Sequence, residues 1–569
     1  MDFKQRVAAL LLCLPALFLS AQSKAPENWF TKDQSKDGVQ GTSSDQTLAA
    51  LKAKGKKGQT IVVAVLDSGI DYKHEDLKDI MWVNPGEIPD NGIDDDKNGY
   101  VDDIHGWNFL GGPNGESVAH ETLEMTREYA RLSKKFNGTN GKNLYGDAKK
   151  EYDYYLEVKE AYEEARARAE GMKEQIASQF VKFENAFALI TKSSGKANFT
   201  LDDLAKMDAG SNEELKDAIT LSQRVMAQGL TPENLAEQKK EASAYADGQL
   251  QYNLNPDYNP RTIVGDDPND LSNRFYGSNE YRGPDAGHGT HVAGIIAAIR
   301  NNDIGIDGIA DNVRIMTVRC VPDGDERDKD VANAIRYAVD NGASIINMSF
   351  GKGYSPDKAY VDEAVKYAAE HDVLLVHAAG NDAENNDKTA NFPNDEYITP
   401  VKKGWFKKEK SAPNWLEVGA LSWRTGDKRI AGFSNYGKKN VDVFAPGHQL
   451  NSTVPDNEYA VFSGTSMASP AAAGVAAIIR SYYPELSAKQ VRSVVMESVA
   501  KQEGEVTKPG STDKVKFSDI CVSGGIVSAS NAVALAEKTK PENQKKYKKA
   551  TWRKAGMAAE KKSGKTVTP

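Results

Sequence analysis

Residues 61–69 read IVVAVLDSG, an apolar, β-branched run that ends in an acidic residue and a turn. A continuous apolar run of this kind is typical of a strand buried on both faces, as in parallel sheets. Asp67 then lies at the carboxyl end of the strand. A buried carboxylate is costly without a partner, and an imidazole N–H is a suitable one. The stretch therefore predicts a parallel sheet with an acid at its edge.

Similar apolar runs recur along the chain and alternate with helical patterns. Strands that alternate with helices predict a mainly parallel sheet covered by helices on both faces, which is a three-layer α/β fold. The clearest helical patterns lie at 329–340 and 360–371. The further strands are expected at 315–318, 344–348, 373–378, 415–418 and 441–444.

A long polar segment, 111–251, interrupts this alternation and is rich in Glu, Lys and Ala. Between Tyr155 and Ile190 apolar or small residues return at every seventh position, which favours a long packed helix or a coiled-coil-like hairpin. We therefore expect an all-helical insertion that divides the α/β body into two parts, 58–110 and 252–537.

The two ends of the chain differ from this body. Residues 1–21 carry basic residues, an apolar run and a small-residue cleavage site after Ala21, which predicts an export signal and an extracellular or periplasmic protein. No later run is long enough to span a membrane. An N-terminal segment, 22–57, follows the signal, and the basic tail, 538–569, is expected to be disordered.

Charge and cysteine content narrow the function. The net charge of -9 arises from 72 basic and 81 acidic residues, so no large field of one sign points to nucleic acid as a partner. After signal cleavage Cys320 and Cys521 remain. In an exported protein they are either a disulfide or two buried free thiols, and the sequence leaves both possibilities open.

Two further motifs add a base and a nucleophile to the acid. His288 lies in AGHGTHVAG, where glycines allow close backbone approach and the next residues open a buried helix. Ser466 lies in SGTSMASP at the start of a helix, beside N–H groups that suit an oxyanion. Asn381 follows a buried strand in HAAGN and offers an amide donor.

The motifs VAVLDSGID, GHGTHVAG, AAGN and GTSMASP, in this order, resemble those of the subtilisin-like family of serine peptidases. The resemblance implies a serine endopeptidase that cleaves proteins or peptides through an acyl-enzyme, without an organic cofactor. Ser466 would be the nucleophile and His288 the general base. Asp67 would orient the histidine, and Asn381 would stabilise the oxyanion.

The resemblance also implies substrate-binding segments. One is an extended stretch that would pair with the substrate backbone, and two strips would flank the primary pocket. No acidic residue lies in the strips, so we expect a broad apolar preference. The extended stretch, 319–323, includes Arg319, Cys320 and Val321, and the strips are Ser349, Phe350 and Gly351, with Ala378, Ala379 and Gly380.

Residues 94–103 follow the pattern D-x-D-x-N-G-Y-x-D-D, which is typical of a calcium loop. His105 occupies the position at which an EF-hand has Glu, so the motif is not a complete EF-hand. It is either an isolated calcium loop or a solvated acidic turn, and the sequence does not decide between them. The resemblance implies a second calcium site at Asp76 and Asn301. The predicted ligands of the loop are Asp94, Asp96, Asn98, Tyr100 and Asp102.

The insertion allows a second hypothesis for the whole chain. A catalytically silent protein of the same fold could bind or adhere through the helical segment. In an active enzyme the insertion would leave the body between Asp67 and His288 and emerge near the active-site region. We then expect it to screen access or to recruit substrates.

Overall fold

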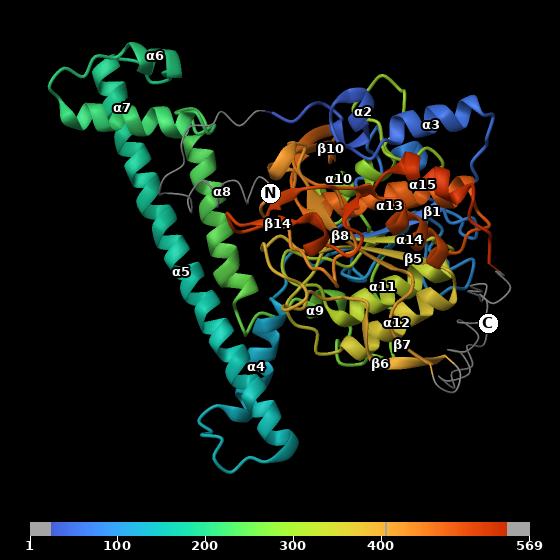
Figure 1. Ribbon diagram of the computed structural model, residues 1–569. Helices are drawn as coiled ribbons and strands as arrows, with labels where there is room; N and C mark the ends of the chain where they lie inside the picture. Colours follow the sequence, from blue (N-terminus) through green and yellow to red (C-terminus); the bar gives the residue numbers. More distant parts are fainter. Residues whose placement is uncertain (1–23, 404–406, 543–569) are drawn as a thin grey trace. The chain divides into compact units, whose positions relative to one another are not determined.

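The computed structural model describes residues 24–403 and 407–542 (Figure 1). The predicted export signal and residues 543–569 of the predicted tail lie outside this part. The described chain forms two compact units, one of residues 125–258 and the other of 24–124 with 259–542. We call residues 125–258 the helical unit and the remainder the sheet unit.

The sheet unit is built on a nine-stranded sheet in the order β12-β15-β9-β8-β5-β4-β1-β3-β2. All its recorded strand pairings are parallel except that of β12 with β15. The strands predicted from apolar runs are all present, which confirms the parallel α/β fold. The strands are β1 (Ile61–Asp67), β2 (Gly106–Asn108), β3 (Val313–Arg319), β4 (Ile345–Met348), β5 (Leu374–Ala378), β8 (Trp415–Leu421), β9 (Val443–Pro446), β12 (Ala500–Lys501) and β15 (Gly525–Ile526).

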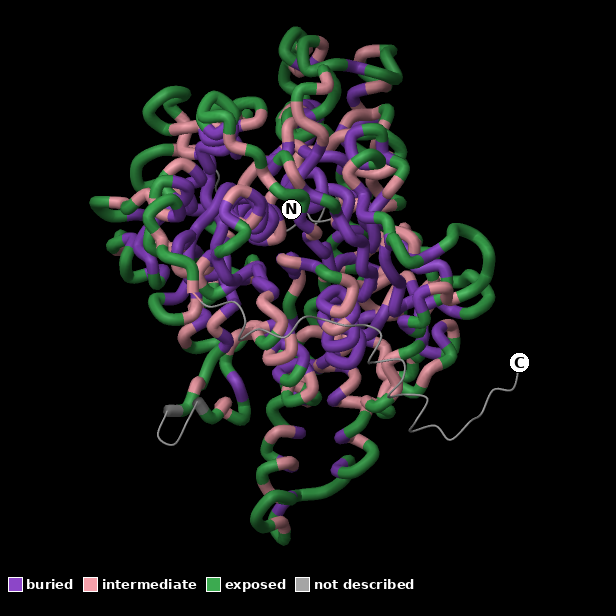
Figure 2. The backbone as a smooth tube through the Cα atoms, turned by 90° about the vertical axis from the view of Figure 1, so that its right-hand side faces the viewer, coloured by how far each residue is buried: buried purple, intermediate pink, exposed green. Residues whose placement is uncertain are grey.

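Helices cover both faces of this sheet (Figure 1). Strand β1 shows why its apolar run is unbroken: Val63 and Val65 enter one core, and Ala64 and Leu66 enter the other. Figure 2 shows buried backbone in purple inside the molecule and exposed loops in green around it. One core holds α3 (Ser44–Ala53), α10 (Gly287–Ala297), α13 (Thr465–Tyr482), α14 (Ala488–Glu497) and α15 (Ala529–Ala536), and the other holds α11 (Asp328–Asp340) and α12 (Lys358–Glu370).

The N-terminal segment belongs to the folded body. It contains η1 (Trp29–Thr31), α2 (Gln34–Asp37) and α3. Trp29, Phe30, Leu48 and Leu51 are buried in a core of the sheet unit, whereas α2 is exposed. The Trp29 indole donates a hydrogen bond to the Gln449 carbonyl. These contacts tie the start of the described chain to a loop more than 400 residues away in sequence.

The helical unit confirms the long helix expected from seven-residue spacing. Helix α5 (Gly146–Ser194) is 49 residues long. It buries every member of the row that begins at Tyr155 and ends at Ile190. Its neighbours are α4 (Glu124–Phe136), α6 (Leu201–Lys206), α7 (Glu213–Met226), α8 (Leu235–Gly248) and the π-helix η3 (Gln249–Asn253).

Residues 111–124, which the polar composition placed in the insertion, lie in the sheet unit instead. Gly111 pairs with Ser117, and Glu121 donates a backbone hydrogen bond to Asp323. Such short pairings leave no periodic apolar pattern, so the composition alone did not reveal them. The sheet unit also contains α9 (Arg261–Val264) and the hairpins β6 (Glu396–Lys403) with β7 (Lys407–Ser411), β10 (Leu450–Val454) with β11 (Glu458–Phe462), and β13 (Glu505–Thr507) with β14 (Lys514–Lys516).

The structure decides between the two states left open for the cysteines. Cys320 and Cys521 are both buried and free, without a disulfide between them. Within the described ranges, no helix combines the length and apolarity needed to cross a bilayer.

Candidate active site

Asp67 and His288 form a hydrogen-bonded pair at the carboxyl end of β1. The Nδ1 atom of His288 lies 2.7 Å from Oδ1 of Asp67. The carboxylate is 2% exposed, whereas the imidazole is 36% exposed, so the acid is shielded and the base is accessible. The Ser68 N–H also donates to Oδ1 of Asp67 at 2.7 Å. This arrangement keeps the Nε2 edge of the imidazole for chemistry.

The glycines around His288 permit this contact. A Cβ on Gly289 would lie 2.2 Å from the Gly69 carbonyl oxygen, so only glycine fits where α10 approaches the turn after β1. His291, one turn further, is fully buried, and this burial lowers its pKa to about 3. His291 is therefore neutral and structural, in contrast to the half-exposed His288.

Sheet register brings Ser466 to the same edge. Leu66 pairs with Met348, so Ser349 follows β4 level with Asp67. The hydroxyl of Ser466 donates to the Ser349 carbonyl at 3.1 Å, and the Ser349 hydroxyl donates to the Ser466 carbonyl at 2.9 Å. Ser466 is the second residue of α13, where backbone N–H groups lack helical partners. The serine thus stands among donors at the carboxyl edge of the sheet, the usual place for ligands in such folds.

Asn381 is held next to Ser466 through Thr465. Its Oδ1 accepts from the Thr465 N–H at 2.8 Å and from the Thr465 hydroxyl at 3.1 Å. With the oxygen so occupied, the NH₂ group of the Asn381 amide is left to donate to another acceptor. A Cβ on Gly464 would lie 3.6 Å from both the Ser466 nitrogen and Oδ1 of Asn381, so these groups are neighbours. Two donors that suit an oxyanion thus lie close together.

The predicted substrate stretch does not present all its side chains. Arg319 and Cys320 are buried, and the Arg319 guanidinium donates to the carbonyls of Ser68 and Val118. These two side chains are therefore structural, and only the backbone of these residues is left for the predicted pairing with substrate. Val321 is partly exposed, and pairing through the stretch's backbone stays a prediction.

Asn391, which the sequence did not single out, bridges the two pocket strips. Its Nδ2 donates to the carbonyls of Ala378 and Ala379, both at 3.2 Å. A Cβ on Gly351 would lie 2.4 Å from Oδ1 of Asn391. The side chain therefore spans the space between the strips. No local pattern marks Asn391, because the pairing of Lys352 with Phe392 brings it there from another loop.

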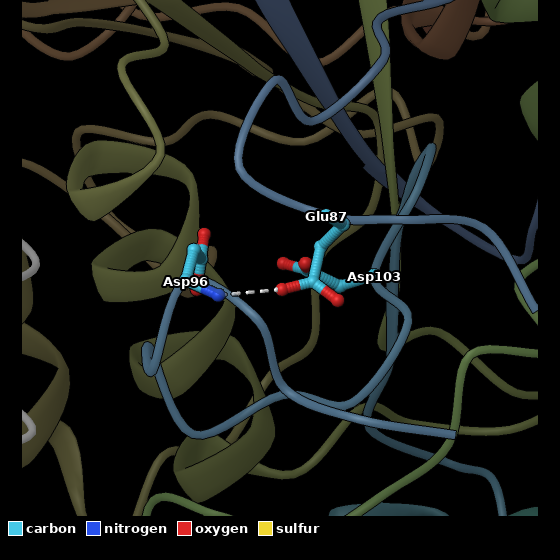
Figure 3. Close-up of side chains that lie close together, drawn as sticks. All are labelled: Glu87, Asp96 and Asp103. Carbon is cyan, nitrogen blue, oxygen red and sulfur yellow. Dashed lines mark hydrogen bonds between the residues drawn. The ribbon is translucent and has the colours of Figure 1, made fainter. Parts of the chain in front are cut away.

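The acidic loop gathers a different set of carboxylates from the predicted one. Glu87, Asp96 and Asp103 are buried, and their oxygens lie within 4.8 Å of one another (Figure 3). Burial raises the pKa of all three groups, to about 8 for Asp103, where the nearby Asp96 adds to the effect. Three buried carboxyl groups so close together repel one another when ionised, so a bound divalent cation would relieve them.

The other predicted loop ligands have different partners. Asp94 accepts backbone N–H groups of its own loop, and Asp102 accepts those of Asn91 and Gly92. The Tyr100 hydroxyl donates to the Arg274 carbonyl. Asn98 does join the carboxylates, because its amide donates to Asp96 and Asp103. Glu87 was missed because it precedes the motif and reaches it only after the chain folds back.

The two residues predicted for a second calcium site, Asp76 and Asn301, have different hydrogen-bond partners. Asp76 is fully buried, and its Oδ1 accepts from the Asn302 amide at 2.7 Å. Asn301 instead donates its backbone N–H to Asp307. Both carboxylate oxygens of Asp76 are bonded, because Oδ2 accepts the Ile306 N–H. The partner of Asp76 in this loop is therefore Asn302, not Asn301.

The chain is a three-layer α/β protein, with a mainly parallel sheet between two layers of helices. An Asp–His pair and a serine near the start of a helix lie at the carboxyl edge of this sheet. The chain belongs to the subtilase family, whose sequence profile matches residues 58–516.

Several characterised relatives share part of this match. A thermophilic serine proteinase of Bacillus sp. (strain AK1) is 43% identical over 195 residues, which cover 34% of this chain and 42% of the relative. Alkaline elastase YaB of Bacillus sp. (strain YaB) is 37% identical over 226 residues, which cover 40% of this chain and 53% of the relative. Subtilisin DY of Bacillus licheniformis is 37% identical over 221 residues, which cover 38% of this chain and 72% of the relative. The first two alignments thus span about half the length of those relatives.

Proposed function

We propose that this protein is a serine endopeptidase that hydrolyses peptide bonds in proteins or peptides. The observation that carries the proposal is the 2.7 Å contact between the accessible His288 imidazole and the buried Asp67 carboxylate. Family membership supports the same activity, and its relatives include proteins named as serine proteinases. The alternative of a catalytically silent binding protein has no observation in its favour.

In the proposed mechanism the Ser466 hydroxyl attacks the carbonyl carbon of the scissile bond. His288 takes the hydroxyl proton at Nε2 and later gives it to the leaving amine, which forms the acyl-enzyme. The buried Asp67 carboxylate holds the Nδ1–H tautomer and stabilises the imidazolium. The Asn381 amide and the Ser466 N–H stabilise the oxyanion. Water then attacks the acyl-enzyme with His288 as base.

A fluorophosphonate probe tests this proposal directly. The probe should phosphonylate the wild-type protein, and mass spectrometry should find the adduct on the peptide that contains Ser466. Hydrolysis of a peptide library should stop as labelling reaches completion. An adduct on another serine, with full peptidase activity retained, would contradict the proposal.

The primary pocket is proposed to accept short apolar side chains. Its two strips carry no acidic residue, which supports an apolar preference. The Asn391 side chain, which reaches from the Ala378 and Ala379 carbonyls to Gly351, shortens the space between them. A pocket closed in this way should exclude large aromatic side chains before the scissile bond.

Replacement of Asn391 by glycine should therefore shift specificity toward large residues. For Asn391→Gly we expect the ratio of kcat/KM for phenylalanine over alanine before the scissile bond to rise by about 10- to 100-fold. The measurement compares two peptides that differ only at this residue. Because both are cleaved by the same enzyme sample, a loss of folded protein cancels in the ratio. An unchanged ratio would remove Asn391 from the pocket.

Calcium is the proposed ligand of the acidic loop. Hard oxygen donors from several carboxylates suit this ion, and Asn98 is close enough to add a carbonyl oxygen after rotation of its amide. The proposed ligand set is Glu87, Asp96, Asn98 and Asp103, so it keeps two of the residues predicted from the motif. The ion would neutralise a cluster that is costly in its absence, and its role would be structural.

Calorimetric titration with calcium tests this site. Asp96→Ala should weaken calcium binding by about 100-fold, since it removes one charged ligand from a preformed cluster. Asp90→Asn is the matched control, because Asp90 is an exposed carboxylate nearby that does not belong to the cluster. It should change affinity by no more than about threefold. Equal binding by wild type and Asp96→Ala would reject the site.

Two further points concern the cellular location of the protein and the role of its helical unit. We propose that the protein acts outside the cytoplasm, extracellularly or in the periplasm, on the strength of the signal-like residues 1–21. That the helical unit screens or recruits substrates stays a prediction.

A further inference from the structure

Ser466 lies four residues before a proline of its own helix. In an α-helix the carbonyl of residue i accepts the N–H of residue i+4. Pro470 has no N–H, and its ring crowds the carbonyl of the residue four positions earlier. The Ser466 carbonyl therefore loses its helical donor at the very residue that carries the proposed nucleophile.

Ser349 supplies the missing donor. Its hydroxyl donates to the Ser466 carbonyl at 2.9 Å, while its own carbonyl accepts the Ser466 hydroxyl at 3.1 Å. The two residues thus hold each other through two reciprocal hydrogen bonds. The first bond fixes the peptide plane after Ser466, and with it the backbone that carries the attacking oxygen.

Two more buried side chains orient the Ser349 hydroxyl. Asn347 donates from Nδ2 to Oγ of Ser349 at 2.9 Å, and its Oδ1 accepts the Ser469 hydroxyl at 2.7 Å. With Asn347 donating to its oxygen, the Ser349 hydroxyl donates its own proton to the Ser466 carbonyl. The donors therefore follow one another from Ser469 to Asn347 to Ser349, and the Ser466 carbonyl is the final acceptor.

The burial of Asn347 indicates that this series of hydrogen bonds does more than fill the core. Asn347 is fully buried in β4, and its register partners are Val65 and Val376. An amide in such an apolar layer is costly unless its hydrogen bonds are satisfied, and an apolar residue would fill the space without that cost. Ser469 is also fully buried, and Ser349 is 4% exposed.

We propose that Asn347, Ser349 and Ser469 are positioning residues that hold Ser466 in its attacking geometry. This inference, which rests on the proposed function, predicts an effect on turnover rather than on substrate binding. A displacement of about 1 Å at a reacting group can cost on the order of 100-fold in rate. The charge at the site does not change, so the pH dependence of kcat should stay as in the wild type.

The test compares variants of the full chain by kcat, KM and thermal unfolding. Ser349→Ala should lower kcat by about 100-fold and Ser469→Ala by about 10-fold, with KM within about twofold of wild type. Ser469→Thr keeps the hydroxyl and should recover most of the loss. Ser481→Ala is the matched control, because Ser481 is a buried serine of the same helix that bonds the Gln59 carbonyl instead. It should keep wild-type kcat.

A double variant keeps the test valid if a single variant fails to fold. Asn347→Leu with Ser469→Ala removes both partners of one bond, which leaves no buried group unpaired between them. It should fold and still lose about 10-fold or more in kcat. If the single and double variants keep kcat within about twofold of Ser481→Ala, the positioning role is wrong. Failure of the proposed function itself would show differently, as hydrolysis that survives Ser466→Ala.

Discussion

Ser466→Ala should lower kcat by about a millionfold, the size of loss that follows removal of the nucleophile from a serine peptidase of this kind. Without the hydroxyl no acyl-enzyme forms, and only general stabilisation of the transition state by the oxyanion donors remains. The rate is measured with a fluorogenic peptide under saturating conditions. Phosphonylation at this residue should disappear in the same variant.

Further variants test whether Ser466 and His288 act together and provide a control. His288→Ala should cost about as much as Ser466→Ala, and the double variant should cost little more than either, because the groups act as one unit. Ser481→Ala removes a buried hydroxyl elsewhere in α13 and should leave kcat unchanged. Additive losses in the double variant would mean that Ser466 and His288 do not act together.

The sheet was predictable because its signal is local. The run 61–66 is apolar at every position, and the structure shows why: its alternate side chains enter two different cores. Seven-residue spacing likewise predicted the long helix α5. Residues 111–124 and the three hairpins escaped, because isolated bridges and short antiparallel ribbons carry too few residues for a periodic pattern.

The site was predictable only where a residue sits in a motif with its own backbone geometry. Asp67 is the last residue of β1, and His288 and Ser466 are each the second residue of a helix, so glycine turns and helix starts reveal them. Glu87 and Asn391 reach their sites from loops with no such mark, because only the folded chain brings them there. The burial of Arg319 likewise depends on carbonyls from other segments, which no local pattern reveals.

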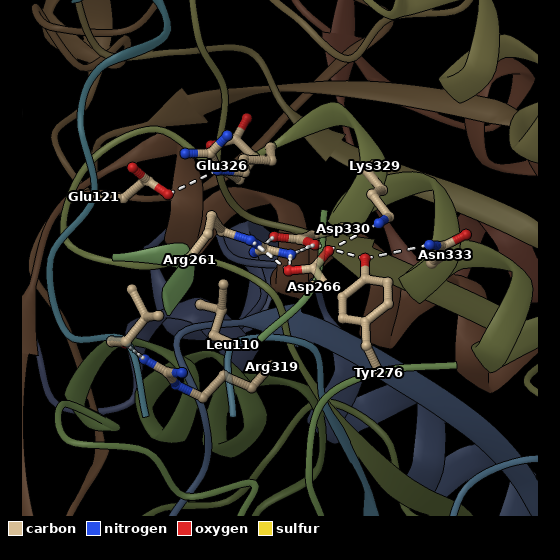
Figure 4. Close-up of polar contacts among 12 residues, drawn as sticks. Leu110, Glu121, Arg261, Asp266, Tyr276, Arg319, Glu326, Lys329, Asp330 and Asn333 are labelled. Carbon is tan, nitrogen blue, oxygen red and sulfur yellow. Dashed lines mark hydrogen bonds and ion pairs between the residues drawn. The ribbon is translucent and has the colours of Figure 1, made fainter. Parts of the chain in front are cut away.

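A second large effect is expected at a buried ion network on the sheet unit (Figure 4). Arg261 and Lys329 contact Asp266, and Arg261 also forms a bidentate pair with Asp330 through bonds of 2.8 and 3.2 Å. Their side chains are at most 2% exposed. Tyr276 completes the set by donating to Asp330 at 2.6 Å. Two cations and two anions thus balance inside the protein.

Arg261→Leu should lower the free energy of unfolding of the sheet unit by about 3–5 kcal/mol. Removal of one partner from a buried ion pair leaves an uncompensated charge, here that of Asp330. Unfolding in urea, followed by tryptophan fluorescence in the Ser466→Ala background, measures the change without self-cleavage. No tryptophan lies in residues 125–258, so the helical unit contributes no tryptophan signal.

Arg282→Leu is the matched control for this network. Arg282 pairs with Asp456 at 2.8 Å, but the two side chains are 40% and 77% exposed, so its removal should cost about 1 kcal/mol or less.

Burial alone would raise the pKa of Asp266, yet Arg261 and Lys329 hold it below its ordinary value. The stabilisation is therefore present above that value and lost as the pH falls through the lowered one. The gap between wild type and Arg261→Leu should narrow in acid, whereas equal losses for both arginine variants at neutral pH would contradict the network's role.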